Sequence, residues 1–231
     1  MIPLFRNSIT TQNIDDDIYY GFPASFRDAI AFRFNAKDTP NFVLREDTGE
    51  FFVVSYTDPI SGITISQPTA SLQPKRLPAG KIVFNGHTLV NTSINLNAQS
   101  VVGCFGAITL PLTYPNNPSD TYCFTNSDNE IGIYGRAGTS NLRTDFLQNI
   151  KINNVASTIL QNNCTVYGER VFPATNNTYL LVGAQGEFPT GFAYRYVIAE
   201  FYEIIYFNRV LTNSERAELQ TYLESFHGFT P

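Results

Sequence analysis

The sequence predicts an all-β fold: an antiparallel sandwich closed by one short C-terminal helix. Three observations predict it. Phe, Tyr, Val, Ile and Thr, which favour the pleated surface of a strand, are abundant, and aromatic residues alone make up 14% of the chain. From residue 28 onward, short apolar runs alternate with turn signatures rich in Asn, Gly and Pro. A single stretch of helical periodicity follows the last apolar run.

Length and composition bound the domain organisation. The chain has 231 residues, of which 43% are hydrophobic and only 15% charged, so one large domain with a sizeable core is expected over residues 26–231. Residues 1–25 are more polar and include the acidic triplet Asp15–Asp17. This segment is either an arm that docks on a partner or a first strand with its loop, and the sequence leaves both open.

The expected strands lie between the turn signatures. They are Ala29–Asn35, Glu50–Tyr56, Lys81–Asn85, Ser100–Leu110, Thr121–Thr125, Glu130–Arg136, Phe146–Ile152, Cys164–Arg170, Thr178–Gly183 and Tyr194–Asn208. The last strand is apolar on both faces, which predicts that it is covered on both sides in the middle of the sandwich.

The helix that follows has a start, an apolar stripe and a stop. Thr212 and Glu215 have the spacing of a capping box, in which each side chain bonds the backbone of the other residue. Gly228 is placed to end the helix in a left-handed conformation. The expected apolar stripe consists of Leu219, Tyr222, Leu223 and Phe226.

The C-terminal residues resemble the signature of a known family. The strand end Glu203–Arg209, followed by the capped helix that ends at Gly228, is similar to the C-terminal motif of laminin G-like, concanavalin A-like domains. The segments Ala31–Asp38, Val53–Gly62, Gln67–Pro74 and Lys81–Gly86 resemble further motifs of that family in the same order.

The resemblance implies a two-sheet antiparallel jelly-roll sandwich with one short C-terminal helix. It also implies structural roles: Glu203 takes the place of the family's strand glutamate, and Asn208 and Arg209 that of its turn pair. We expect Glu203 to hydrogen-bond this turn. Tyr56 stands where the family usually has Trp, and Asn35 where it has Asp, so a ligand role for that Asp does not transfer.

Charge and hydropathy exclude several classes of partner. The net charge is −5, and basic residues never cluster beyond Lys75 and Arg76, which argues against nucleic acid. No apolar run approaches the ~18 residues that span a bilayer, so membrane insertion is not expected. The start Met1–Arg6 lacks the pattern of a secretory signal, so export by that route is not expected.

The cysteines Cys104, Cys123 and Cys164 are odd in number and widely spaced. This pattern favours buried free thiols over a disulfide framework or a zinc site. A bridge between Cys104 and Cys123 is the alternative, and it requires an oxidising compartment.

Catalysis is not expected, because no motif places the required groups together. The closest pair of carboxylates, Glu200 and Glu203, is three residues apart on a strand, which predicts side chains on opposite faces. The histidines His87 and His227 have no nucleophile motif beside them. We therefore predict a protein that is not an enzyme.

Calcium is left open. Many domains of the family that the sequence resembles hold one Ca²⁺ through oxygen ligands. Asp128–Glu130 and Asp15–Asp17 are the oxygen-rich segments, although solvated loop charge is the favoured explanation for both. No metal ligand is assigned, and no other cofactor is expected.

A ligand site is expected to use aromatic rings and amides in the loops, because rings stack on sugar faces and amides bond hydroxyls. The alternative is that these residues are ordinary surface or core. The candidates are Tyr114, Asn116, Asn117, Tyr122, Tyr134 and Arg136.

These observations together favour a virion structural or adhesion protein, such as a capsid decoration, head-fibre or tail-fibre subunit, assembled in the host cytoplasm. Its expected partners are other virion proteins or copies of itself, and a host-surface glycan. The first alternative is a carbohydrate-binding module at the cell surface or outside the cell. A glycoside hydrolase on the same fold is the second.

Overall fold

The computed structural model describes residues 22–94, 96–109, 121–127, 131–136, 139–144, 147–171, 179–187, 192–196 and 198–228. Within these residues the chain is mainly antiparallel β-sheet with one C-terminal α-helix, which confirms the predicted all-β class. Three short 3-10 helices accompany the strands: η1 (Ala24–Ala29), η2 (Thr39–Asn41) and η3 (Ala70–Leu72).

The strands of the first half of the chain are β1 (Ile30–Asn35), β2 (Phe42–Asp47), β3 (Glu50–Thr57), β4 (Thr64–Ser66), β5 (Lys75–Leu77), β6 (Lys81–Asn85), β7 (Leu89–Asn91) and β8 (Ser100–Thr109). Those of the second half are β9 (Thr121–Ser127), β10 (Ile131–Arg136), β11 (Leu147–Ile152), β12 (Val155–Ala156), β13 (Cys164–Arg170), β14 (Leu180–Val182), β15 (Ala184–Glu187), β16 (Phe192–Tyr196) and β17 (Ile198–Phe207).

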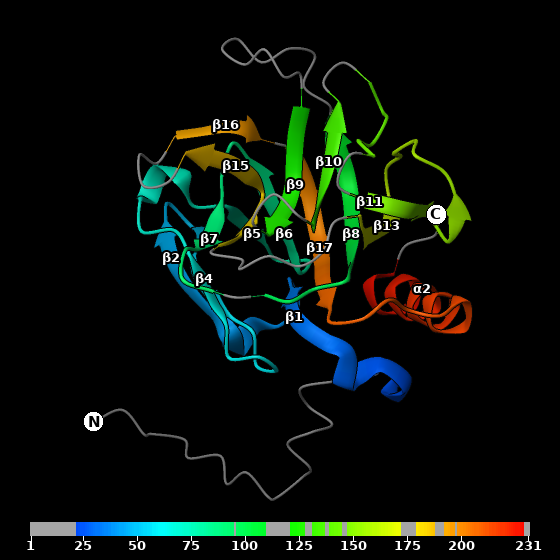
Figure 1. The fold of residues 1–231 in the computed structure, drawn as a ribbon. Coiled ribbons are helices and arrows are strands. Elements are labelled where there is room, and N and C mark those ends of the chain that lie inside the picture. The colour runs from blue at the N-terminus through cyan, green and yellow to red at the C-terminus, as the bar shows by residue number, and fades with distance from the viewer. Residues whose placement is uncertain are drawn as a thin grey trace, which may run out of the picture.

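The strands follow one hydrogen-bonded path that folds back on itself. Its order is β10-β9-β14-β7-β4-β3-β5-β6-β17-β8-β13-β11-β12, with β1 beside β17 and β2 beside β3, while β15 and β16 form a separate pair. In Figure 1, β9 and β10 lie in front of β17 and β8, so the first strands of the path form a layer that faces strands of its second half. The finer prediction of a jelly-roll order stays a prediction.

Strand β17 lies in the middle of its layer, as its two apolar faces predicted. One edge pairs with β8 over the whole strand, from Ile198 to Phe207. The other edge pairs first with β6 and then with β1. Every residue from Phe201 to Phe207 is buried.

Two apolar clusters cover the two faces of this layer. The larger one fills the space between the layers and includes the contacting rings of Phe105, Phe124 and Phe201, with Phe105–Phe124 centroids 4.5 Å apart. The smaller one lies on the outer face, where residues of β8 and β17 pack against η1 and the helix α2 (Asn213–His227).

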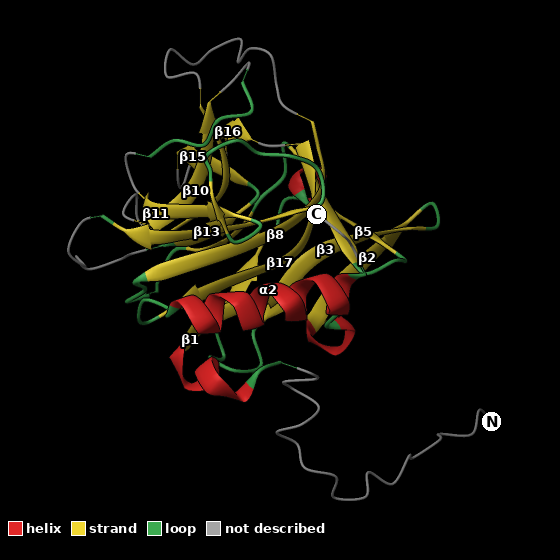
Figure 2. Ribbon diagram, turned by 90° about the vertical axis from the view of Figure 1, so that its right-hand side faces the viewer, coloured by secondary structure: helices red, strands yellow, loops and turns green. Residues whose placement is uncertain are grey.

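Helix α2 lies along the outer face of the layer, in front of β17 and β8 in Figure 2. Its capping box is formed as predicted, since Thr212 accepts from the Glu215 amide and Glu215 accepts from the Thr212 amide. Gly228 ends it with φ 70°. Leu219, Tyr222 and Leu223 are buried and Phe226 is half-buried, which confirms the apolar stripe.

The predicted final strand Tyr194–Asn208 is two elements. β16 pairs with β15, and β17 begins afresh at Ile198 inside the main sheet. Periodicity could not separate them because both runs are apolar. The prediction also missed β2, a strand that pairs only with β3 and carries the polar end Arg45–Asp47, as edge strands commonly do.

Residues 1–21 of the predicted N-terminal segment lie outside the described residues. Its last residues belong to the fold: Phe22 is 1% exposed within the outer cluster, and η1 begins at Ala24.

Candidate functional site

Three ionisable side chains meet in the interior between β1, β17 and the end of α2. The Arg33 Nε donates to Glu203 Oε1 at 2.5 Å, and His227 Nε2 lies 2.8 Å from Glu203 Oε2. The Glu203 and His227 side chains are fully buried and that of Arg33 is 5% exposed. We call these three residues the buried triad.

Further contacts surround the Arg33 guanidinium. Its Nη2 donates to the Tyr222 hydroxyl at 2.7 Å, and its carbon lies 4.7 Å from the centroid of the Phe22 ring. Burial raises the pKa of the Glu203 carboxyl, but the adjacent Arg33 charge and the bond from His227 outweigh it and hold that pKa below its ordinary value. The carboxylate is therefore charged and paired at neutral pH.

A bulge puts Glu200 and Glu203 on the same face of β17, contrary to the prediction from their spacing. The pairing with β8 shifts between Phe201 and Glu203, so one extra residue enters β17 at this point. Glu200 bonds Lys81, whose amine lies 5.2 Å from the centroid of the Tyr202 ring, and this ring in turn lies beside His227. Regular alternation, on which the prediction relied, does not hold across a bulge.

Glu203 does not hydrogen-bond the turn at Asn208 and Arg209, which corrects our expectation for this residue. Its two oxygens are occupied by Arg33 and His227. The turn is held in another way. The Asn208 amide donates to the Ala29 carbonyl at 2.8 Å, and Ser100 donates to the Arg209 carbonyl at 2.8 Å.

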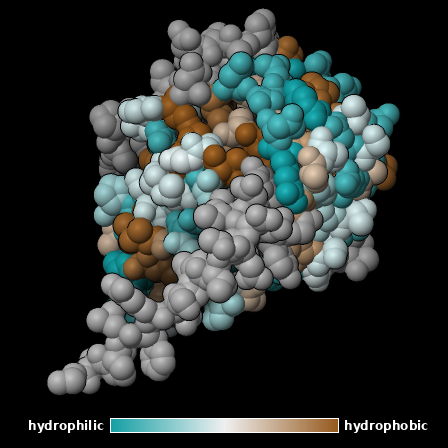
Figure 3. Space-filling view, turned by 90° about the horizontal axis from the view of Figure 1, so that it is seen from below, coloured by the Kyte–Doolittle hydropathy of each residue, from teal (hydrophilic) through white to brown (hydrophobic). Residues whose placement is uncertain are grey.

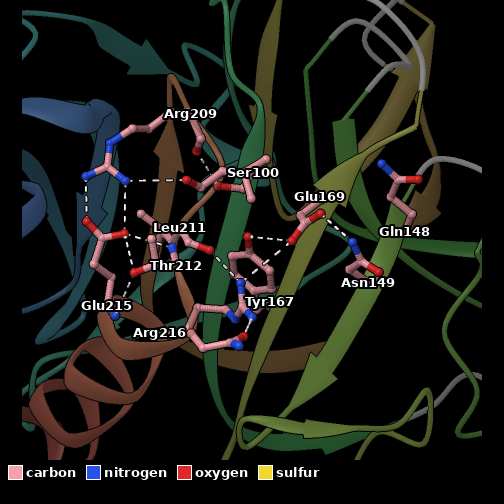
Figure 4. Close-up of polar contacts among 12 residues, drawn as sticks. Ser100, Gln148, Asn149, Tyr167, Glu169, Arg209, Leu211, Thr212, Glu215 and Arg216 are labelled. Atoms are coloured by element: carbon pink, nitrogen blue, oxygen red, sulfur yellow. Dashed lines mark hydrogen bonds and ion pairs between the residues drawn. The ribbon is translucent and has the colours of Figure 1, made fainter.

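Arg209 and Glu215 join the turn to the first helical residues (Figure 4). The two guanidinium nitrogens of Arg209 contact the Glu215 carboxylate at 3.0 and 2.6 Å. Glu215 also accepts from the Thr212 amide at 2.7 Å. These donors lower the pKa of Glu215 to about 2, chiefly through the hydrogen bond from Arg209.

A second polar network links α2 to the neighbouring strands β13 and β11 (Figure 4). Arg216 lies over the Tyr167 ring and within 3.7 Å of Glu169. Glu169 accepts from the Tyr167 hydroxyl at 3.0 Å and from the Asn149 amide at 2.6 Å. Burial, with help from Glu169, raises the pKa of Tyr167 to about 12, so the phenol stays neutral at physiological pH.

A buried aspartate anchors β1 from the opposite direction. Asp58, directly after β3, accepts the Arg33 backbone N–H at 3.0 Å and also bonds Ser61 and the Ile60 amide. Burial raises the pKa of this carboxyl. Arg33 is thus fixed through its backbone as well as its side chain.

Of the predicted ligand residues, the structure describes the side chains of Tyr134 and Arg136. Tyr134 is 2% exposed, which corrects the expectation that it lies on the surface, because its position on β10 faces a small cluster with Cys123 and Leu181. Arg136 is exposed at the end of the same strand. Tyr122 lies in β9, but its side chain is outside what the structure describes, as are Tyr114, Asn116 and Asn117 entirely.

Arg33, His227 and Arg216 were missed as partners in these networks. Arg33 carried one usable signal, because an arginine within the apolar run Ala31–Phe34 has to find a buried partner. His227 was considered only as a catalytic candidate without a nucleophile motif beside it. Its bond to Glu203 joins residues 24 positions apart and depends on how α2 folds back.

Metal and thiol expectations have different outcomes. Cys104, Cys123 and Cys164 are buried and form no disulfide, as predicted, so the alternative bridge between Cys104 and Cys123 is not formed. Both oxygen-rich segments, Asp15–Asp17 and Asp128–Glu130, lie outside the described residues. Among the residues that are described, no three His, Cys, Asp or Glu side chains gather as a metal site.

In the same described part of the chain, no helix has the length and hydropathy to cross a membrane.

A surface groove runs along α2, between Pro23 at the start of η1 and Lys37 after β1, next to the buried triad. It is lined by Pro23, Lys37, Glu218, Thr221, Tyr222, Ser225 and Phe226, and we call it the η1–α2 groove. Figure 3 shows the end of the molecule that carries η1, where hydrophobic residues form separate brown patches among hydrophilic ones.

Comparison of the chain with protein-family models, with curated proteins and with solved structures finds no significant match.

Proposed function

We propose that the chain is a non-catalytic structural and adhesion domain. One observation carries this proposal: the ionisable side chains of the buried triad and of the Arg216–Glu169 network pair with other protein groups, and His227 and Arg216 do so across the contact between α2 and the sheet. Their charges stabilise the attachment of the helix, and their reactive atoms face protein.

The same observation argues against a glycoside hydrolase. Such enzymes need two carboxylates that face a substrate cleft. The Glu203 side chain is fully buried, and Glu200 is half-buried and paired with Lys81 at 2.7 Å. Although the bulge brings both residues to one face, Glu203 has no path to a sugar.

The setting that we propose is a virus particle, with the domain displayed on its surface and the chain held by other virion proteins or by copies of itself. The resemblance to laminin G-like, concanavalin A-like domains supports this setting, since such domains occur in viral structural and adhesion proteins. A host-surface glycan is the proposed target of adhesion.

Mass spectrometry of purified particles, combined with immunogold labelling on intact ones, tests the setting. We expect the chain in gradient-purified particles at a fixed ratio to the major capsid protein, with label on the outer surface. Its presence only in the soluble fraction of the lysate would overturn the virion proposal.

A glycan array tests adhesion separately. We expect the purified chain to bind a restricted set of glycans, and Arg136→Ala, at the exposed end of β10, serves as a first surface variant. Failure to bind any glycan would contradict the proposed adhesion to a host-surface glycan, and only the structural role would remain. Release of sugar during the same incubation would instead restore the hydrolase.

A further inference from the structure

The floor of the η1–α2 groove is aromatic. The rings of Tyr222 and Phe226 are stacked, with centroids 5.2 Å apart and an angle of 17° between their planes. The Lys37 amine lies 4.8 Å from the centroid of the Phe226 ring and donates to the Phe226 carbonyl. Because Phe226 is only half-buried, part of this aromatic surface remains open at the groove.

The described chain begins at the edge of this groove. Phe22 is 1% exposed, and its ring meets that of Tyr222 edge to face at 4.9 Å. Two guanidinium nitrogens of Arg27 donate to the Phe22 carbonyl, and Pro23 forms part of the groove wall. The point from which residue 21 and its predecessors are tethered is therefore fixed beside the groove.

The sequence just before Phe22 suits this surface. It reads Ile18-Tyr-Tyr-Gly21, and it follows the acidic triplet Asp15–Asp17. At ~3.3–3.6 Å per residue, Tyr20 reaches at most about 7 Å and Tyr19 about 10 Å from Phe22. Aromatic pairs in edge-to-face or offset contact are favourable, and the Lys37 cation at the rim complements the acidic residues.

We propose that the η1–α2 groove binds residues Ile18–Tyr20 of the same chain, with a tyrosine ring extending the Phe22–Tyr222–Phe226 series. The covalent link to Phe22 favours this binding, because a short linker gives an effective concentration in the millimolar range. Weak contacts between the segment and the groove therefore suffice for occupancy. The segment then straps the N-terminus to α2. This inference stands independently of the proposed function.

Thiol labelling at the groove wall tests the proposal in the full-length chain. Ser225 lines the groove and is exposed, while the three native thiols are buried, so Ser225→Cys introduces a selective reporter. In this background, Tyr19→Ala/Tyr20→Ala is compared with the unaltered segment. The control is Leu4→Ala/Phe5→Ala, which also removes two large side chains but nearer the N-terminus, farther from Phe22 in sequence.

We expect the tyrosine double variant to react with a maleimide about two- to tenfold faster than the unaltered segment, and the Leu4/Phe5 variant to react at the unaltered rate. Tyr19→Phe/Tyr20→Phe should keep most of the protection, because the rings remain. Val155→Cys on β12, 65% exposed, should label equally in all backgrounds, which shows that the effect is local.

Equal labelling of Ser225→Cys in every background would overturn the proposal. Protection that rises with protein concentration would also overturn it, by identifying a second copy as the occupant. Circular dichroism verifies that each variant is folded. Labelling is measured on the isolated chain, so failure to find the protein in virus particles leaves this result unchanged.

Discussion

At the scale of single residues, Arg33 and Glu203 show the asymmetry of a buried ion pair. Removing two charges from water costs several kcal/mol per ion, and the pair recovers this only when each group is fully bonded. Here the Glu203 carboxylate hydrogen-bonds Arg33 and His227, and the Arg33 guanidinium also donates to the Tyr222 hydroxyl. Loss of one partner leaves the other charge buried without compensation.

Glu203→Gln should therefore lower the free energy of unfolding by about 3–5 kcal/mol, measured by urea denaturation at pH 7. Glu200→Gln is the matched control on the same face of β17. Its partner Lys81 is 26% exposed, so we expect a loss below about 1 kcal/mol. Equal losses in the two variants would contradict this role for the triad.

Acid should destabilise the protein through Glu203 and Glu215. Both have a lower pKa in the folded chain than when unfolded, so each contributes stability above its ordinary pKa of 4.5 and loses it as pH falls through the folded value. For Glu215 that loss extends from about pH 4.5 to about pH 2. Unfolding free energies measured between pH 6 and pH 2 should fall less steeply in Glu215→Gln.

Sequence reasoning found part of this chemistry. The capping residues Thr212 and Glu215 could be predicted because the interaction is local and its spacing is fixed. The pairing of Arg33 with Glu203 spans 170 residues, so only the tertiary structure determines it. A buried arginine indicates that it has a partner of opposite charge, but the sequence does not identify that residue.

At the scale of elements, α2 combines strong end signals with a modest apolar stripe. Thr212→Ala removes the side-chain acceptor for the Glu215 amide and should cost about 1 kcal/mol of unfolding free energy, read from chemical denaturation. Ser225→Ala, at an exposed site in the last turns, is the control and should change stability by less than about 0.5 kcal/mol. The reverse order would show that the cap does not matter.

The junction between β14 and β15 depends on Gly183. Its φ is 101°, and a Cβ there would lie 1.9 Å from Phe84 Cδ1. Gly183→Ala should destabilise the fold by about 3 kcal/mol or more, from overpacking and backbone strain together. Gly62→Ala is the comparison, because its φ is 72° but an added Cβ would have no heavy atom within 4 Å, so it introduces backbone strain without a clash. It should lower the free energy of unfolding by about 1 kcal/mol in the same denaturation assay.

Elements were predicted best where turn residues such as Asn, Gly and Pro bound the run clearly. The bounds of β6 and β13 agree with the expected Lys81–Asn85 and Cys164–Arg170. Short strands such as β4 and β5, three residues each, were missed because so few side chains define no period.

At the scale of the whole molecule, two apolar clusters share one sheet layer, and β17 supplies residues to both. Phe201 and Ile204 face the space between the layers, whereas Tyr202 and Ile205 face α2. An element that belongs to both clusters couples them, so helix and sandwich should unfold together.

The three thiols provide the measurement. Cys104 lies in the cluster beneath α2, Cys164 in the central one, and Cys123 in a third, smaller cluster. Pulsed alkylation with mass spectrometry along a urea gradient should show all three becoming reactive at the same midpoint. Earlier reaction of Cys104 would mean that α2 detaches first. Phe226→Ala, at the half-buried end of the stripe, should leave the midpoints coincident while shifting all of them to lower urea.

The bulge in β17 has a consequence for anyone who aligns or redesigns this chain. Upstream of it, odd-numbered side chains point inward to the central cluster; downstream, even-numbered ones do. A template with strict two-residue periodicity would exchange the inward and outward side chains in the second half of the strand. It would place the Glu203 carboxylate in the central cluster, among Phe105, Phe124 and Phe201. Deleting one of the two residues at the bulge, Tyr202, would instead leave a regular alternation in which Glu203 still faces α2, so the change would fall on the register with β8 and not on the facing of the side chains.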